Sequence, residues 1–331
     1  MNTNSSQMPV LVGVGVANQR HEDPRQALEP IHLMLRAIRE AARDAGNMEM
    51  LSHAEVISVP KGMWTYTNPA GWLSETLGAH AKTVLAEIGV LQQTLIGDAC
   101  SRIASGEAEM VVVAGGEAKY RQLRASILGI ELEDSTIDDT PDEVLKPEAE
   151  LWSPIEAAAG LGMPVGYYAL MESALRAHLG ESVEGNQAAL AELYARFSAV
   201  AAHNEDAWHR QAYSAEDIRR VGSDNRMLAF PYVKRHNTQW NVDQAAALIF
   251  CSQGMAEKLG LDQGKWIYPQ ASTESNYMVN TAQRAELHNC PGARIAGFAA
   301  LDHVGVKASD LDFIELYSCF PSAVRTFARE L

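Results

Sequence analysis

The sequence is poor in cysteine and in positive charge, and it has no long hydrophobic run. Its 331 residues include four cysteines, with no Cys-x-x-Cys pair, so neither a zinc site nor a disulfide framework is indicated. No apolar run of about 18 residues occurs, and the polar N-terminus lacks a secretory signal pattern. The sequence therefore predicts a cytoplasmic protein with no membrane span, no metal and no resident cofactor.

The excess of acidic over basic residues limits the kinds of molecule that the protein is expected to bind. The chain has 42 acidic and 27 basic residues, and its formal net charge is −15. Such a chain is unsuited to binding nucleic acid or anionic membranes, so a phosphorylated ligand would need a locally basic site. One basic set stands out, which could hold phosphate groups or could simply be solvated charge. Its members are Arg219, Arg220, Lys234, Arg235 and His236.

Short β-branched segments alternate with helical patterns, which predicts an α/β protein whose mostly parallel sheet has helices on both faces. The central pair is a buried helix at 89–105 and a strand at 110–114. Other expected strands are 9–16, 55–59, 245–251, 265–272 and 311–317. Other expected helices are 28–45, 69–77, 163–179, 188–203, 218–221, 255–259 and 293–303.

The length exceeds what one hydrophobic core usually serves, so several segments are expected. Residues 131–150 carry nine acidic residues and one lysine, which indicates a solvated loop. The β-α-β order returns near the end of the chain, which suggests an internal duplication. The predicted parts are a first half at 1–119 with 231–252, an inserted helical lobe at 120–230, and a partial second half at 253–331.

Three stretches carry a family resemblance. The sequence Ala-Ser-Gly-Glu-Ala-Glu-Met-Val-Val-Val-Ala-Gly-Gly-Glu-Ala, starting at Ala104, resembles a helix end and strand of the thiolase superfamily. Residues 241–260 and 293–320 resemble later family segments in the same order. The chain is most similar to thiolase-like proteins of the acetyl-CoA acetyltransferase type. This resemblance implies a five-layer α-β-α-β-α fold with mixed, mostly parallel sheets, an inserted helical lobe and, here, an incomplete second half.

The resemblance also implies an acyl-CoA ligand and a cysteine nucleophile at the start of the central helix. A helix N-terminus favours the thiolate there. In this sequence the nucleophile position falls at Gly89, and no Cys, Ser or Thr lies between Val84 and Gln93. The family's Asn-Glu-Ala-Phe turn reads Tyr-Ser-Cys-Phe and ends at Phe320. The Gly-His-Pro loop and the final cysteine loop are not found, so the standard catalytic residues are missing.

Two hypotheses follow for function. The first is an acyltransferase of altered mechanism that uses Cys319 or Ser318, with a coenzyme A thioester as substrate. The second is a non-catalytic acyl-CoA-binding or scaffold subunit that needs a partner chain or a second copy, which would complete the second sheet. Cys319 could equally be a packed side chain. Under either hypothesis, the ligand would be held by Arg219, Arg220, Lys234, Arg235 and Tyr317.

Overall fold

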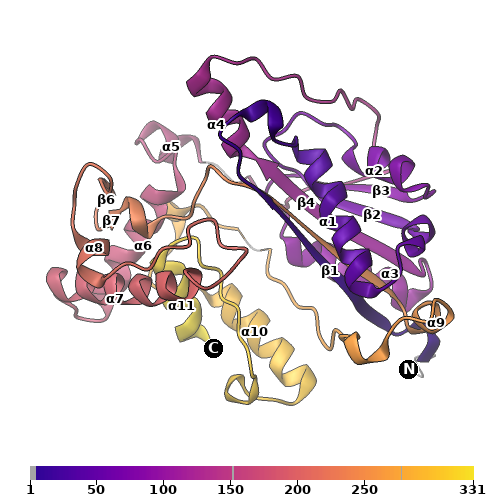
Figure 1. Ribbon diagram of the computed structural model, residues 1–331. Helices are drawn as coiled ribbons and strands as arrows, with labels where there is room; N and C mark the ends of the chain where they lie inside the picture. Colours follow the sequence, from indigo (N-terminus) through magenta and orange to yellow (C-terminus); the bar gives the residue numbers. More distant parts are fainter. Residues whose placement is uncertain (1–4, 151–152, 277) are drawn as a thin grey trace. The chain divides into compact units, whose positions relative to one another are not determined.

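The computed structural model describes residues 5–150, 153–276 and 278–331 (Figure 1). The chain divides into two compact units. Unit 1 consists of Met1–Pro147 and Trp240–Ser272, and unit 2 consists of Glu148–Gln239 and Thr273–Leu331. Each unit therefore contains segments that are far apart in the sequence.

Unit 1 is built on one mixed sheet with the strand order β1-β8-β4-β2-β3-β5. β8 runs antiparallel to both of its neighbours, β1 and β4, whereas β4, β2, β3 and β5 are parallel. This arrangement confirms the predicted α/β class with a mostly parallel sheet. The strands are β1 (Pro9–Gln19), β2 (Val56–Pro60), β3 (Lys82–Ala86), β4 (Met110–Ala118), β5 (Glu143–Leu145) and β8 (Asp243–Ser252).

Two apolar clusters cover the two faces of this sheet. On one face, α1 (Pro30–Ala45) and α2 (Pro69–Leu77) pack on the strands, and on the other face α3 (Gln92–Ser105) does so. The contact between α1 and β1 is close because β1 carries glycine beneath the helix. A Cβ added at Gly15 would lie 2.1 Å from the Ala37 carbonyl oxygen. The remaining helices of unit 1 are α4 (Lys119–Leu128) and α9 (Gln253–Lys258).

Unit 2 is mainly helical, with a short antiparallel pair formed by β6 (Met227–Ala229) and β7 (Tyr232–Val233). A 3₁₀ turn, η4 (Lys234–His236), follows this pair. No described helix in either unit is long and apolar enough to cross a membrane. The helices are α5 (Pro154–Ala158), α6 (Pro164–His178), α7 (Val183–Ala201), α8 (Ala215–Arg219), α10 (Pro291–Val304) and α11 (Pro321–Glu330).

The central helix differs from the expectation at its start and in its burial. α3 begins at Gln92, because Gly89 has a φ of 108°, which is incompatible with a right-handed helix. The buried side chains of α3 are those of Leu95, Ala99, Arg102 and Ile103, so one side of the helix is covered rather than several. The residue at the expected nucleophile position therefore lies in the turn that precedes the helix.

Two predicted strands, 265–272 and 311–317, are wrong. Residue Ile267 makes only an isolated bridge to Leu11, and the second segment has no strand partner among the described residues. Its side chains are solvated instead, and Phe313 is 94% exposed. Residues 253–331 contribute helices and no strand in the part of the chain that the structure describes (Figure 1). The expected repetition of the β-α-β order is thus not formed.

Three elements of unit 1 were missed by the sequence analysis, and one of them, the strand β5, lies within the segment 131–150 that was expected to be a solvated loop, where it pairs with β3. β3 is a five-residue strand, and α4 starts directly after β4 at a point where no regular structure was expected. Asp243 fixes α4 because its carboxylate accepts hydrogen bonds from the backbone N–H groups of Tyr120 and Arg121, at 2.8 and 3.0 Å. Unit 1 thus extends past the predicted boundary at residue 119, while the three-part division into thiolase halves and lobe stays a prediction.

Candidate functional site

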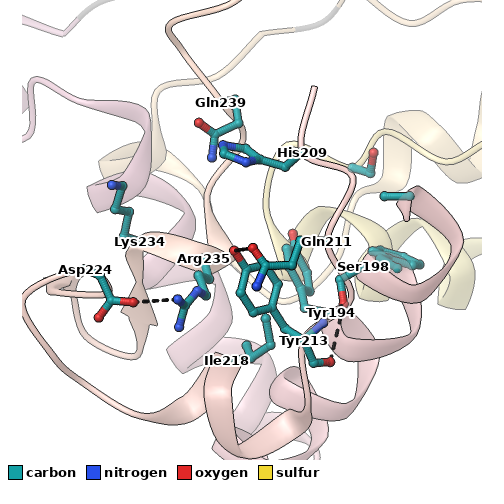
Figure 2. Close-up of a pocket in the computed structure, with 13 residues that line it drawn as sticks. Tyr194, Ser198, His209, Gln211, Tyr213, Ile218, Asp224, Lys234, Arg235 and Gln239 are labelled. Atoms are coloured by element: carbon teal, nitrogen blue, oxygen red, sulfur yellow. Dashed lines mark hydrogen bonds and ion pairs between the residues drawn. The ribbon is translucent and has the colours of Figure 1, made fainter. Parts of the chain in front are cut away.

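A cavity of about 410 Å³ lies within unit 2, between α7, α8 and the segments that flank them (Figure 2). We call it the main pocket. Its walls combine aromatic rings with two cationic side chains. The lining residues are Tyr194, Phe197, Ser198, Ala201, His209, Gln211, Tyr213, Ile218, Asp224, Lys234, Arg235, Gln239 and Ser318.

Hydrogen bonds fix the shape of one wall. The Ser198 hydroxyl on α7 donates to the carbonyl oxygen of Ala195 at 2.8 Å and accepts from the backbone N–H of Tyr213 at 2.9 Å. Ser214 then starts α8 through a capping box with Asp217. The loop that carries Tyr213 is therefore hydrogen-bonded to α7 through Ser198 (Figure 2), and it continues into the capped first turn of α8.

The two cations of the main pocket differ in their surroundings. The guanidinium of Arg235 lies 4.4 Å from the centre of the Tyr213 ring and forms an ion pair with Asp224 at 2.7 Å. Lys234 is exposed, and no ion-pair partner for its ammonium is found within the described ranges. Lys234 is therefore the cation that is available to an anionic ligand, and Arg235 provides a fixed platform beside it.

The turn before α11 brings a cysteine close to several phenols. Ser318 lines the main pocket, and the backbone carbonyl of Cys319 accepts a hydrogen bond from Thr238 N–H at 3.2 Å. Burial and hydrogen bonding with the Cys319 thiol raise the pKa of Tyr168, and burial and the same thiol raise the pKa of Tyr317 to about 12. Burial and the nearby Cys319 also raise the pKa of Tyr194.

These pKa shifts define what the cluster can do. The three phenols stay protonated at neutral pH, so they can donate hydrogen bonds toward the region of the Cys319 thiol. Donors fixed in a partly dry site stabilise negative charge that develops on a sulfur or an acyl oxygen. The arrangement is therefore suited to stabilising an anion, and it supplies no strong base of its own.

A buried polar network holds this turn in place. Glu172 on α6 is fully buried and pairs with Arg325 on α11. It also accepts hydrogen bonds from Asn186 at 2.9 Å and from the Tyr232 hydroxyl at 3.0 Å. The Tyr232 hydroxyl in turn accepts from the backbone N–H of Ser322 at 3.1 Å, in the first turn of α11. The position of Ser318 and Cys319 thus depends on four elements of unit 2.

The structure separates the predicted basic set. Lys234 and Arg235 line the main pocket, whereas Arg219 and His236 line a second, smaller cavity. Arg220 lines neither of these cavities, and its guanidinium lies 3.7 Å from Asp217. The five basic residues therefore do not form one phosphate site.

The other predicted residues lie as follows. Ser318 lines the main pocket, whereas Tyr317 and Cys319 do not; these two residues interact with each other and with Tyr168. Tyr317 is 60% exposed. Gly89 belongs to unit 1. Sequence reasoning missed the aromatic residues Tyr168, Tyr194 and Tyr213. Tyr168 and Tyr194 lie on predicted helices, where an aromatic residue is more often part of a hydrophobic core. Nothing in the sequence therefore distinguishes them as candidate site residues.

The fold is thiolase-like. The chain is similar to a monomeric SCP2-thiolase-like protein type 1 from Mycobacterium smegmatis, with a TM-score of 0.78 and 26% identity. That match covers 98% of this chain and 63% of the other. Two further structures match 98% of this chain, namely the Ltp2–ChsH2(DUF35) aldolase and an acetyl-CoA acetyltransferase from Syntrophomonas wolfei.

The last two similarities concern the fold alone. The aldolase has a TM-score of 0.68 and 17% identity over 76% of its chain, and the acetyltransferase has 0.59 and 16% over 82% of its chain. No family model and no curated protein matches the sequence. The expected thiolase-like fold is thereby confirmed, and the chain spans about 63% of the length of the Mycobacterium smegmatis protein.

Proposed function

We propose that the protein is a thiolase-like acyl-CoA-binding protein and that its main pocket holds the nucleotide end or the pantetheine arm of the ligand. The observation that carries this proposal is the combination of an exposed Lys234, the Arg235–Tyr213 platform and Ser318 around one cavity of about 410 Å³. Lysine supplies a point charge for a phosphate, and an aromatic–cation surface suits a flat base. The proposed ligand class is also the one in the name of an acetyl-CoA acetyltransferase that shares this fold.

Calorimetric titration of the protein with coenzyme A tests this proposal. We expect Lys234→Ala to weaken binding about tenfold, because it removes the available cation of the pocket. Lys307→Ala removes an exposed lysine of the same unit that lies outside the pocket, and it should leave the affinity unchanged. A flat titration with the unaltered protein, or equal losses in the two variants, would exclude the main pocket as the coenzyme A site.

A reaction at Cys319 is the catalytic form of this proposal. The thiol would attack the acyl carbon of a thioester, so that a bond from that carbon to Cys319 Sγ forms while the bond to the coenzyme A sulfur breaks. The proton of Cys319 would leave with the departing thiol. The neighbouring phenols would stabilise the oxyanion. Ser318 is the second candidate, with its hydroxyl on the pocket wall.

Labelled acetyl-CoA separates the two candidates. Retention of label on the protein, its loss in Cys319→Ala and its persistence in Ser318→Ala would support Cys319 as the acyl acceptor. Cys290→Ala serves as the control, because Cys290 is another partly exposed cysteine of unit 2 and lies at the start of α10 rather than in the turn before α11. Binding of coenzyme A without any protein-bound label would leave the ligand assignment standing and remove the catalytic form.

A non-catalytic subunit is the alternative, and two observations favour it. Gly89 occupies the expected nucleophile position with a φ of 108°, a conformation that L-residues rarely adopt. One structural relative is a complex of Ltp2 with ChsH2(DUF35). Under this alternative the protein binds acyl-CoA and works only with a partner chain. Turnover that appears when a DUF35-type protein is added, and that is absent from either chain alone, would support it.

A further inference from the structure

A second cavity of about 280 Å³ lies on the other side of η4 within unit 2. Its wall is apolar except for one cation, one amide and one imidazole. The lining residues are Gln187, Arg219, Val221, Met227, Pro231, Val233 and His236. The ring of His236 meets the ring of Tyr194 edge to face, with 5.4 Å between the centroids. Since Tyr194 lines the main pocket, these two rings separate the cavities, and η4 contributes two residues to the main pocket and one to the second cavity.

The hydrogen bonding of His236 leaves one group without a partner. Its Nδ1 accepts a hydrogen bond from the backbone N–H of Val233 at 3.3 Å, so a neutral ring carries its proton on Nε2. Burial lowers the pKa of His236 to about 4, which keeps the ring neutral at physiological pH. His236 is 3% exposed, and its Nε2 has no hydrogen-bond partner. A buried donor of this kind destabilises the folded protein while it is unsatisfied, and an acceptor that reached it would remove this cost.

Arg219 supplies the positive charge of the same cavity. Its guanidinium pairs with Glu216 at 2.7 Å, one helical turn earlier, and both side chains are more than half exposed. Such a surface pair contributes little, and the planar guanidinium has five N–H donors, so it can bind a second acceptor. The cavity therefore offers one neutral donor, one cation and an apolar wall.

We propose that this second cavity is a binding site for a small monocarboxylate with a short hydrocarbon chain. One carboxylate oxygen would accept the hydrogen bond from His236 Nε2, and the other would face the guanidinium of Arg219. The hydrocarbon chain would lie against Val221, Met227 and Val233. The proposal does not depend on coenzyme A binding, because the two cavities share no lining residue.

Hexanoate is the probe for this site, and the imidazole ¹⁵N resonances of His236 provide the first readout. We expect saturable binding that shifts the Nε2 resonance of His236 in the unaltered protein, so this measurement requires no variant. Hexanamide keeps the chain length and removes the charge, and it should bind at least tenfold more weakly. An unmoved His236 resonance at saturating hexanoate would overturn the proposal, as would the absence of any binding.

Neighbouring arginines provide a matched pair of variants. Arg219→Gln and Arg220→Gln each remove one positive charge at the end of α8, but only Arg219 lines the cavity. We expect Arg219→Gln to weaken hexanoate binding at least tenfold and Arg220→Gln to change it less than twofold. Lys234→Ala, in the main pocket, should have no effect on hexanoate. Equal losses in the two arginine variants would show attraction by net charge alone and would contradict the site.

Discussion

Unit 1 and unit 2 are stabilised by different kinds of contact. In unit 1, two apolar clusters fill both faces of a six-stranded sheet, and α1 approaches β1 at backbone distance. The apolar cluster of unit 2 has four buried members, Ala169, Leu190, Tyr232 and Phe320, and it adjoins the charged network around Glu172. The comparison indicates that the stability of unit 1 depends on close packing of its side chains and backbone. The stability of unit 2 depends on every member of its buried polar network having a partner.

The largest loss of stability is expected from a substitution that breaks the polar network of unit 2. Arg325→Leu leaves the carboxylate of Glu172, which is fully buried, without its cation. Removing one partner of a buried ion pair costs about 3–5 kcal/mol, because the remaining charge is uncompensated. We expect hydrogen exchange in α6 and α11 to accelerate strongly, while exchange in the sheet of unit 1 stays close to that of the unaltered protein.

Arg329→Leu is the control for this experiment. It alters an exposed arginine of the same helix, for which no ion pair is found in the described part of the chain, and its effect should stay within about 0.5 kcal/mol. If both variants had the same small effect, the network would not be the element that holds α11.

The next effect tests the packing of unit 1. Gly15→Ala places a Cβ 2.1 Å from the Ala37 carbonyl oxygen and 2.4 Å from the Ala41 nitrogen. Both neighbours are backbone atoms of α1, so the helix itself must move. We expect a loss of about 3 kcal/mol in the free energy of unfolding, at the upper end of the usual cost of overpacking. Chemical denaturation and hydrogen exchange in α1 measure it.

Gly162→Ala provides the comparison in unit 2, because an added Cβ there meets no atom within 4 Å and its φ is not positive. Its effect should be within about 0.5 kcal/mol. A Gly15→Ala protein that is as stable as the unaltered one would mean that α1 and β1 tolerate separation, and that unit 1 is less sensitive to shape than its contacts indicate.

The same contrast explains which elements could be predicted from the sequence. β1, α1 and β4 pack through apolar residues, and the hydrophobic pattern located each of them within a few residues, while α2 was located from its start at Asn68-Pro69. The missed helix α4 buries only Arg121 and Ala125, and the backbone N–H groups of its first turn donate hydrogen bonds to a distant carboxylate, that of Asp243. The segment 311–317 is rich in apolar residues but has no strand to pair with among the described residues, and composition alone does not reveal the partner.

In the candidate site, too, some features could be predicted from the sequence and others could not. The cations of the site could be found from the sequence because charge is visible without a structure. Their separation into two cavities could not, because it depends on η4 turning Lys234 and His236 to different sides. The phenols near Cys319 come from α6, α7 and the turn before α11, so only the fold brings them together.

The smallest expected effect is a change in the stability of the folded protein with pH. The folded-state pKa of His236 is about 4, below its ordinary value of 6.5, so the unfolded chain takes up a proton at higher pH than the folded protein does. The corresponding stability is therefore present above about pH 7 and is lost as the pH falls from about 6.5 through 4. Between pH 7 and pH 5 the loss due to His236 is about 2 kcal/mol. Chemical denaturation of the whole protein at each pH measures this loss, with hydrogen exchange read in the peptides that come from unit 2.

Replacing the imidazole isolates this contribution. His236→Phe keeps a planar ring but also removes the acceptor of Val233 N–H, so the variant will be less stable at every pH. The informative quantity is the pH slope, which should flatten by about 2 kcal/mol over that interval. His303→Phe, at an exposed position on α10, should keep the slope of the unaltered protein. An unchanged slope in His236→Phe would mean that the imidazole takes up its proton at the same pH in the folded and the unfolded chain, and that its burial does not lower its pKa.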